Sequence, residues 1–382
     1  MRTAQEILQA AQAFAEEELR PQAGAFEAEE EIPREVIRRL AQQGFLAASF
    51  PVQYGGLALD PVEYGLFTEE IGKACNSMRE LITVHTSLVG ESLLRWGTPA
   101  QKEHWLPKMA RGELLAAFAL TEPDVGSDAR GVRTTYVKTE EGFLLQGRKK
   151  WISFADIADL FLVIASDAQT GEVTAFLVER SQTGVSTTKM SGLLASKASH
   201  LAEIDLHDVV VPHENVLGRI GGGFSYIVNS ALDHGRYSIA WAGVAIAQES
   251  LNAMATYART RRQGGKLICE YDAVQALLAD AHVQLQAARA LCLSVGRLRK
   301  DKHHEAMIQT SIAKVFTSKM AMKVATDAVQ VFGGNGFSNQ YPVERLFREA
   351  KVLEIIEGTS QVLQPVIAQQ VLRTCHHRGA EA

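Results

Sequence analysis

Three short segments of the chain combine residue types that suit chemistry on a small molecule. Residues 120–128 join small hydroxyl residues and glycine, which offer N–H and O–H donors to an electron-rich ligand. Residues 330–337 hold a glycine cluster at the end of a long helical pattern, and residues 354–361 set one carboxylate, Glu357, before a glycine. The first two segments have ordinary alternatives, a polar loop between domains and a helix stop built on left-handed glycines.

Glu357 is the residue best suited to proton transfer. It stands in an apolar stretch directly before Gly358 and a predicted helix start. At an exposed helix end the carboxylate would only complement the helix dipole. Buried among Ile355, Ile356 and Val362 it would lose hydration, and the resulting rise in its pKa would suit a general base. The sequence leaves both interpretations open.

Several common catalytic motifs are missing from the sequence. It has no Gly-x-Gly-x-x-Gly after a strand, no phosphate loop, no His-Glu-x-x-His and no Gly-x-Ser-x-Gly, which argues against a Rossmann nucleotide site. Cys75, Cys269, Cys292 and Cys375 are far apart and form no Cys-x-x-Cys pair. We therefore expect no disulfide framework, no metal site and a reducing compartment.

The composition narrows the class of protein further. The 382 residues are 46% apolar and 22% charged with a net charge of −5, which excludes a disordered or low-complexity chain and predicts two or three domains. The acidic balance argues against a nucleic-acid partner. No stretch reaches the roughly 18 uncharged apolar residues of a membrane span. We expect a cytoplasmic protein without a signal peptide.

The pattern of apolar residues changes twice along the chain. Helical periodicity dominates residues 1–115, beginning with an amphipathic stripe over residues 4–19. Short runs rich in β-formers follow in residues 116–223, as in a small β-barrel or sandwich. Residues 224–382 return to helix, and the proline-free run from Phe224 to Val331 accommodates three long helices. A last helix is predicted from about Thr359, with Pro365 near a kink or early turn.

Read together, these segments resemble one family. Residues 120–128 and 330–348 are similar to the two signature segments of the acyl-CoA dehydrogenases, and Ile356-Glu357-Gly358-Thr359 resembles the family's catalytic-glutamate motif. Trp151-Ile152-Ser153 falls at its flavin-covering strand. The resemblance implies an N-terminal helical domain, a middle β-barrel or sandwich domain and a C-terminal four-helix bundle, with domains at 1–115, 116–223 and 224–382. It also implies FAD held between the subunits of a homodimer or homotetramer.

The resemblance assigns roles residue by residue. Those implied to line or cover the flavin from the β-domain are Phe118, Leu120, Thr121, Gly126, Ser127, Trp151 and Ser153. Those implied to hold the pyrophosphate and adenosine, some from a neighbouring subunit, are Arg261, Gln330, Gly333, Gly334, Thr359 and Gln361. Those implied to contact the substrate are Ser127, Asp233, Arg236 and Gly358; a plain pair of surface helix residues is the alternative for Asp233 and Arg236.

The implied reaction is oxidation of an acyl thioester. Glu357 would remove the α-proton while the β-hydrogen leaves as hydride to flavin N5, and hydrogen bonds from the Glu357 N–H and a ribityl hydroxyl would stabilise the enolate. Some family members carry the base on an earlier helix, at the position of Gly235, which cannot serve. One departure is Gly264, which replaces the usual aromatic of Arg-x-x-Phe-Gly; FAD would be held more loosely unless another side chain fills the gap.

The substrate carrier is the more open question. Residues 74–85, with Arg79 and His85, and Leu201-Ala202-Glu203 are similar to a subgroup acting on carrier-protein thioesters of hydroxymalonyl or methoxymalonyl type in polyketide extender-unit synthesis. We favour this carrier-bound substrate, although Arg79 and His85 suit structural roles equally. A 3-carbon alcohol or aldehyde could then be the hydride source, with Glu357 deprotonating an oxygen. The alternative is an ordinary acyl-CoA α,β-dehydrogenase of fatty- or amino-acid catabolism.

Electrons would pass to an electron-transferring flavoprotein or to oxygen. Two further classes stay open at this point. One is an oxidase of the same architecture acting on nitroalkanes, which is expected to use an aspartate in place of Glu357. The other is a non-catalytic partner or DNA-associated scaffold, against which the net charge of −5 and the intact Glu357 both weigh.

Overall fold

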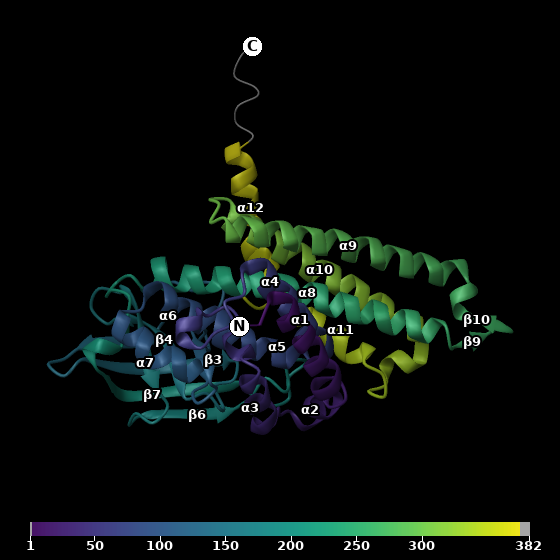
Figure 1. The fold of residues 1–382 in the computed structure, drawn as a ribbon. Helices are drawn as coiled ribbons and strands as arrows, with labels where there is room; N and C mark the ends of the chain where they lie inside the picture. The colour runs from purple at the N-terminus through teal and green to yellow at the C-terminus, as the bar shows by residue number, and fades with distance from the viewer. Residues whose placement is uncertain (1, 375–382) are drawn as a thin grey trace, which may run out of the picture. The chain divides into compact units, whose positions relative to one another are not determined.

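The structure is a computed structural model that describes residues 2–374 (Figure 1). Cys375, the last of the four cysteines, lies outside the described residues. The chain divides into two compact units. One comprises the residues up to Asp60 together with Ser77–Gly235, and the other comprises Pro61–Asn76 together with the residues from Arg236 onward.

The first unit opens with helices, as the apolar periodicity predicts. Two of them begin at capping boxes, in which Thr3 and Thr98 accept from the backbone of Glu6 and Gln101 while those side chains reach back. The helices are α1 (Ala4–Phe14), α2 (Ala23–Glu29), α3 (Arg34–Gln42), α5 (Asn76–Ile82), α6 (Glu91–Trp96) and α7 (Pro99–Ala110). The predicted stripe over residues 4–19 is confirmed as α1 followed by a π-helical turn, Ala15–Leu19.

The β-formers of the middle segment build one eight-stranded sheet rather than a closed barrel, with the order β6-β7-β3-β2-β4-β5-β8 and with β1 paired to β4. The strands are β1 (Ala116–Ala119), β2 (Thr135–Lys138), β3 (Phe143–Ile152), β4 (Leu160–Asp167), β5 (Val173–Glu179), β6 (Val185–Lys189), β7 (Ala202–Val211) and β8 (Val216–Leu217). The central strands β4 and β5 are buried almost throughout, which matches their unbroken apolar sequences.

The second unit consists of long helices, and the three predicted from the proline-free run are confirmed (Figure 1). Its elements are α4 (Pro61–Ala74), α8 (Asn229–Ala258), which begins in the first unit, β9 (Arg262–Gln263), β10 (Lys266–Leu267), α9 (Asp272–Lys300), α10 (Ala306–Phe332), α11 (Val343–Leu353) and α12 (Ser360–Thr374). Pro365 lies inside α12. The predicted face of α9 is buried at Ala281, Leu285 and Ala288.

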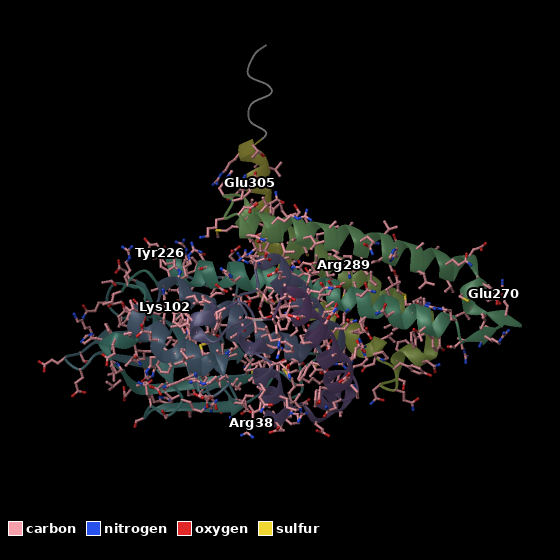
Figure 2. The ribbon with its side chains drawn as sticks, viewed as in Figure 1. Arg38, Lys102, Tyr226, Glu270, Arg289 and Glu305 are labelled. Carbon is pink, nitrogen blue, oxygen red and sulfur yellow. The ribbon has the colours of Figure 1, made fainter. Side chains whose placement is uncertain are left out.

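Glycines and one ion pair set the helix spacing in this unit. A Cβ at Gly243 of α8 would lie 2.7 Å from the Thr317 carbonyl oxygen of α10, so the two backbones approach more closely than a side chain permits. Arg289, labelled on α9 in Figure 2, pairs with Glu69 of α4. Because α4 packs here although it falls within the predicted N-terminal domain, the three-domain division stays a prediction.

Among the described residues, no helix is both long enough and apolar enough to cross a bilayer.

Candidate active site

The loop that follows β1 is anchored to the sheet by a buried ion pair. The Lys149 ammonium of β3 donates to the Glu122 carboxylate at 2.7 Å, to the Leu120 carbonyl at 3.2 Å and to the Ile164 carbonyl at 2.6 Å. Both side chains are almost inaccessible to solvent, 0% for Lys149 and 3% for Glu122. Glu122 also accepts from the backbone N–H groups of Arg133 and Thr134. The loop carrying Thr121 is thereby fixed to the sheet.

Burial and ion pairing shift the pKa values of Lys149 and Glu122 in opposite directions. Burial lowers the pKa of Lys149 to about 8, and the Glu122 charge limits the fall. Burial raises the pKa of Glu122, but Lys149 and the backbone donors outweigh it, so the net pKa lies below the usual value. Sequence reasoning missed both residues. A signal existed, since Glu122 is inside the 120–128 segment and Lys149 is two residues before Trp151.

The predicted flavin-side residues of the first unit gather at one end of β1 and β3. Phe118 lies in β1, and Leu120 and Thr121 follow it. The Lys150 N–H donates to the Thr121 carbonyl at 2.9 Å, which joins this loop to the end of β3 beside Trp151. Phe118 and Leu120 are buried, whereas Gly126 and Ser127 are exposed farther along the loop.

Trp151 and Ser153 occupy a strained segment at the end of β3. Trp151 has a φ of 62° and Phe154 a φ of 61°, both left-handed, and the indole of Trp151 is 50% exposed. The Ser153 hydroxyl donates to Glu80 of α5 at 2.5 Å, and the Ser199 hydroxyl donates to the other oxygen of Glu80 at 2.8 Å. Glu80, which the sequence analysis did not single out as a site residue, therefore clamps this segment to the 196–200 loop.

In the second unit, four of the predicted pyrophosphate and adenosine residues lie where α8 and α10 end, namely Arg261, Gln330, Gly333 and Gly334. Tyr257 of α8 stacks on Phe332 of α10 with ring centroids 4.0 Å apart, and its hydroxyl accepts from the Asn335 amide at 2.8 Å. This contact brings Arg261 near the end of α10. Gln330, Gly333 and Gly334 are exposed there, with Arg261 exposed as well. The aromatic pair was not identified from the sequence.

Glu357 lies in the turn between α11 and α12, in a left-handed conformation with a φ of 56°. The Arg236 Nε–H donates to the Glu357 carbonyl at 3.0 Å, and the Lys314 ammonium donates to the Gly358 carbonyl at 2.7 Å. The carboxylate oxygen Oε2 is buried. Two cationic side chains thus hold the two backbone carbonyls that flank the Cα of Gly358.

The surroundings of Glu357 differ from the apolar pocket that the sequence suggested. Ile355 is 54% exposed, and Ile356 and Val362 are only partly buried. The adjacent groups that the structure adds are the cations Arg236 and Lys314. Burial lowers the pKa of Lys314 to about 8, while the nearby Glu357 charge raises it. Lys314 was missed because a lysine in a helical pattern gives no sign of facing inward.

The remaining substrate and cofactor candidates lie on α8 and at the start of α12. Arg236, predicted to contact the thioester end of the substrate, is directed at the backbone of Glu357. Asp233 is 9% exposed on the same helix, and Gly235 is buried between them. Thr359 accepts from the Val362 N–H at 3.2 Å and so caps α12, while Gln361 is exposed.

The backbone conformation at residue 264 explains why this position is a glycine. With Gly265 it forms the two-residue turn between β9 and β10, with φ of 56° and 84°, a combination typical of a type I′ hairpin. A Cβ at Gly264 would lie 2.5 Å from the Tyr271 hydroxyl, which donates to the Gln263 carbonyl at 2.9 Å. An aromatic ring, that of Tyr271, therefore occupies the space beside the glycine.

The second unit separates the two groups of predicted FAD residues. Gly358 is held by Lys314, and Gln330 lies sixteen residues farther along the same helix α10, which at 1.5 Å per residue is about 24 Å. Thr359 and Gln361 therefore lie far from Gln330 and Gly333 within one chain.

The residues present fit a flat, phosphate-bearing cofactor. A Cβ at Gly126, Gly333 or Gly334 would meet no atom within 4 Å, so ligand atoms can approach the backbone closely at each position. The half-exposed Trp151 ring offers an apolar surface on which an aromatic system can lie. Within residues 2–374 there is no group of three or more metal-ligating side chains.

Comparison with known proteins places the chain in a family. Models of the acyl-CoA dehydrogenase N-terminal, middle and C-terminal domains match residues 2–113, 117–209 and 221–372. A probable acyl-CoA dehydrogenase YngJ of Bacillus subtilis is 36% identical over 94% of this chain and 95% of its own. The chain belongs to the acyl-CoA dehydrogenase family. It is a flavin-dependent oxidoreductase of acyl thioesters, and its cofactor is FAD.

Two solved structures show how far the likeness extends. The butyryl-CoA dehydrogenase of Megasphaera elsdenii has a TM-score of 0.93 and 34% identity, covering 97% of this chain and 98% of its own. The prolyl acyl carrier protein oxidase AnaB has a TM-score of 0.90 and 26% identity, covering 96% and 98%. The predicted order of helical, β-sheet and helical domains is confirmed by these similarities.

Proposed function

We propose that this protein oxidises acyl-CoA thioesters to α,β-unsaturated thioesters, with Glu357 as the general base. The observation that carries the proposal is the Glu357 turn, where the carboxylate is partly buried and Arg236 and Lys314 donate to the carbonyls of Glu357 and Gly358. A carboxylate shielded from water and fixed in place is what abstraction of a weakly acidic α-proton requires. Family membership supplies the reaction class.

In this proposal the protein moves the proton and polarises the carbonyl. The Glu357 carboxylate takes the proton from Cα, and the electron pair left on Cα forms the double bond as the Cβ hydrogen departs with its pair. FAD, when bound, accepts that hydride. We expect the Glu357 N–H to donate to the thioester oxygen, which stabilises the enolate charge that develops there. Exclusion of water strengthens these interactions.

Each unit contains predicted cofactor residues. Phe118, Leu120, Thr121, Gly126 and Ser127 would line it from the sheet end. Trp151 would cover the isoalloxazine, with Ser153 beside it. Arg261, Gln330, Gly333, Gly334, Thr359 and Gln361 would hold the pyrophosphate and adenosine. Ser127, Asp233, Arg236 and Gly358 would contact the substrate, and Arg236 also holds the backbone of the base.

A homo-oligomer follows from the distance along α10. Lys314, which donates to the carbonyl of Gly358 beside Thr359, and Gln330 are about 24 Å apart along α10. We infer from this separation that the two groups of residues in one chain serve different cofactors in a dimer or tetramer. An apolar groove of about 560 Å³ between α10 and α12 supports this, lined by Ile312, Val315, Phe316, Met320, Ile367 and Ala368. Phe316 is 40% exposed and Val366 48%.

A carrier-bound substrate is the second candidate. The similarity to the prolyl carrier-protein oxidase favours it. Against it, the two residues that suggested a carrier-protein subgroup face inward: Arg79 and His85 are both 0% exposed. His85 bonds to the backbone of Met109 and Ala116, a structural role. The CoA thioester, initially the alternative, is therefore the better supported substrate, together with the higher identity to the butyryl-CoA enzyme.

The test is anaerobic reduction of the purified flavoprotein by a panel of acyl-CoA thioesters and the matching carrier-protein thioesters. We expect the flavin to bleach fastest with a CoA thioester and Glu357→Gln to slow bleaching by about 100- to 10,000-fold. Glu344→Gln, a matched change on α11 at a carboxylate paired with Arg348, should bleach normally. A fully active Glu357→Gln enzyme would exclude the proposed base.

The electron acceptor is part of the same proposal. We expect an electron-transferring flavoprotein to reoxidise the flavin, with oxygen as the alternative. Substrate-dependent peroxide without an added acceptor would identify the oxidase route. The nitroalkane and scaffold alternatives lose support, because the family is one of thioester oxidoreductases and Glu357 is in place.

A further inference from the structure

The turn that carries Glu357 is under backbone strain that its surroundings must offset. Its φ of 56° is left-handed, a conformation that is strained for a residue with a side chain. Gly358, with a φ of 95°, continues the same turn. Such a conformation persists only where neighbouring groups hold it, so the contacts to these two residues matter for where the carboxylate lies.

Lys314 is placed to hold this turn from α10. Its ammonium donates to the Gly358 carbonyl at 2.7 Å, and the side chain is 0% exposed. The other contact to the turn, Arg236 to the Glu357 carbonyl, comes from α8. Two long helices thus each contribute one cation to neighbouring carbonyls.

A buried ammonium is costly unless an opposite charge is near. The charged groups facing Lys314 are Glu357 itself, Glu354 at the end of α11, and Arg236 of α8. The two carboxylates attract Lys314 and Arg236 repels it, and the attraction of Glu357 is the larger of the two carboxylate effects. By the same interaction, the Lys314 charge favours the ionised form of Glu357.

We propose that Lys314 is a positioning residue for the base, fixing the Glu357 turn through the Gly358 carbonyl and stabilising the Glu357 carboxylate through its charge. The inference rests on the proposed role of Glu357. It makes two separable statements, one about the backbone of the turn and one about the ionisation of the base.

The experiment compares three variants of the full-length holoenzyme. Lys314→Met removes donor and charge, and Lys314→Arg restores both. Lys323→Met is the matched control, because Lys323 lies on the same helix, is 49% exposed and pairs with Asp280 and Asp327 instead. Two quantities are measured: amide hydrogen exchange of residues 354–363, and the acid limb of the pH profile of kcat/KM.

Lys314→Met is expected to speed exchange in the turn by about tenfold and to move the acid limb up by about one pH unit. The direction follows because loss of a neighbouring cation raises the pKa of a carboxylate. Lys314→Arg should return both quantities toward wild type, and Lys323→Met should change neither. A purely structural lysine would move the exchange alone.

Unchanged exchange and an unchanged acid limb in Lys314→Met would overturn the inference. Exchange is measured without substrate, so this result is distinguishable from failure of the proposed function, which would show instead as full activity in Glu357→Gln. If Lys314→Met does not fold, Lys314→Gln takes its place. An acid limb of Lys314→Gln no higher than that of Lys314→Arg would then overturn the inference equally.

Discussion

Lys149 of β3 and Glu122 of the loop predicted to line the cofactor form a buried ion pair, with 2.7 Å between ammonium and carboxylate. Lys149 also donates to the Leu120 carbonyl, and Glu122 accepts from two backbone N–H groups beyond the loop. The pair therefore does not simply neutralise itself. It ties both ends of residues 120–134 to the sheet, so the loop's shape depends on two charges that no solvent screens.

Removing one partner of the buried Lys149–Glu122 pair should lower the free energy of unfolding more than removing one partner of a surface pair does. Lys149→Met leaves the Glu122 carboxylate buried without its cation, and we expect the free energy of unfolding to fall by about 3 kcal/mol. The reference is Lys189→Met, whose partner Glu31 is 4.0 Å away at a partly exposed site, with an expected loss below about 1 kcal/mol. Urea unfolding of both variants measures the difference, and equal losses would contradict the prediction.

The clamp at Glu80 leads to a second prediction. Because the Ser153 hydroxyl gives its hydrogen to Glu80, its oxygen is left to act as an acceptor toward a bound ligand. Glu80→Ala frees both serines and should weaken FAD retention by about tenfold, since hydrogen bonds to a charged group are worth roughly 1.5–3 kcal/mol. Equilibrium dialysis of FAD measures the change.

Ser199→Ala provides the control for that experiment. It removes only the second hydroxyl on Glu80 and leaves the bond to Ser153 in place. FAD retention should stay close to wild type. A loss as large as that of Glu80→Ala would mean that the 196–200 loop, rather than Ser153, governs cofactor binding.

Gly264 and Gly265, the two residues of the turn between β9 and β10, provide a matched pair for testing the contact between residue 264 and Tyr271. Gly265→Ala meets no atom within 4 Å and should cost only backbone strain, about 1 kcal/mol. Gly264→Ala adds a Cβ 2.5 Å from the Tyr271 hydroxyl and should cost more. Tyr271→Phe in the Gly264→Ala background should recover the difference. Hydrogen exchange across the hairpin measures each step, and equal effects of the two alanines would argue against the Tyr271 contact.

The sequence allowed the long helices, the β-rich middle and the position of Glu357 to be predicted, because each leaves a periodic or local signal. The α9 stripe and the proline-free run are examples. Lys149, Glu80 and Lys314 could not be found this way. Each is a charged, buried residue whose polar partner is distant in the sequence. The partner is a carbonyl 29 residues away for Lys149 and Leu120 and 44 residues away for Lys314 and Gly358, and it is a serine hydroxyl for Glu80.

The sequence also could not predict whether the strands form an open sheet or a closed barrel. Strand propensity indicates that residues pair, but which strands lie at the ends of the sheet depends on pairings such as β1 with β4, which are distant in sequence. The contact made by Arg236 shows a similar limit. Its place on α8 suggested a substrate contact, which stays a prediction, and the hydrogen bond to the Glu357 carbonyl, 121 residues away, was not predicted.

His85 should make the protein sensitive to acid. Burial lowers its pKa to about 4 from an ordinary 6.5, so the folded protein holds it neutral while the unfolded chain takes up a proton below 6.5. Stability then falls as pH drops from 6.5 to 4, by up to about 3 kcal/mol for this residue alone. His85→Gln should flatten that slope, and the exposed His207→Gln should not. Unfolding midpoints in urea across this pH range measure both, and parallel profiles for wild type and His85→Gln would contradict the prediction.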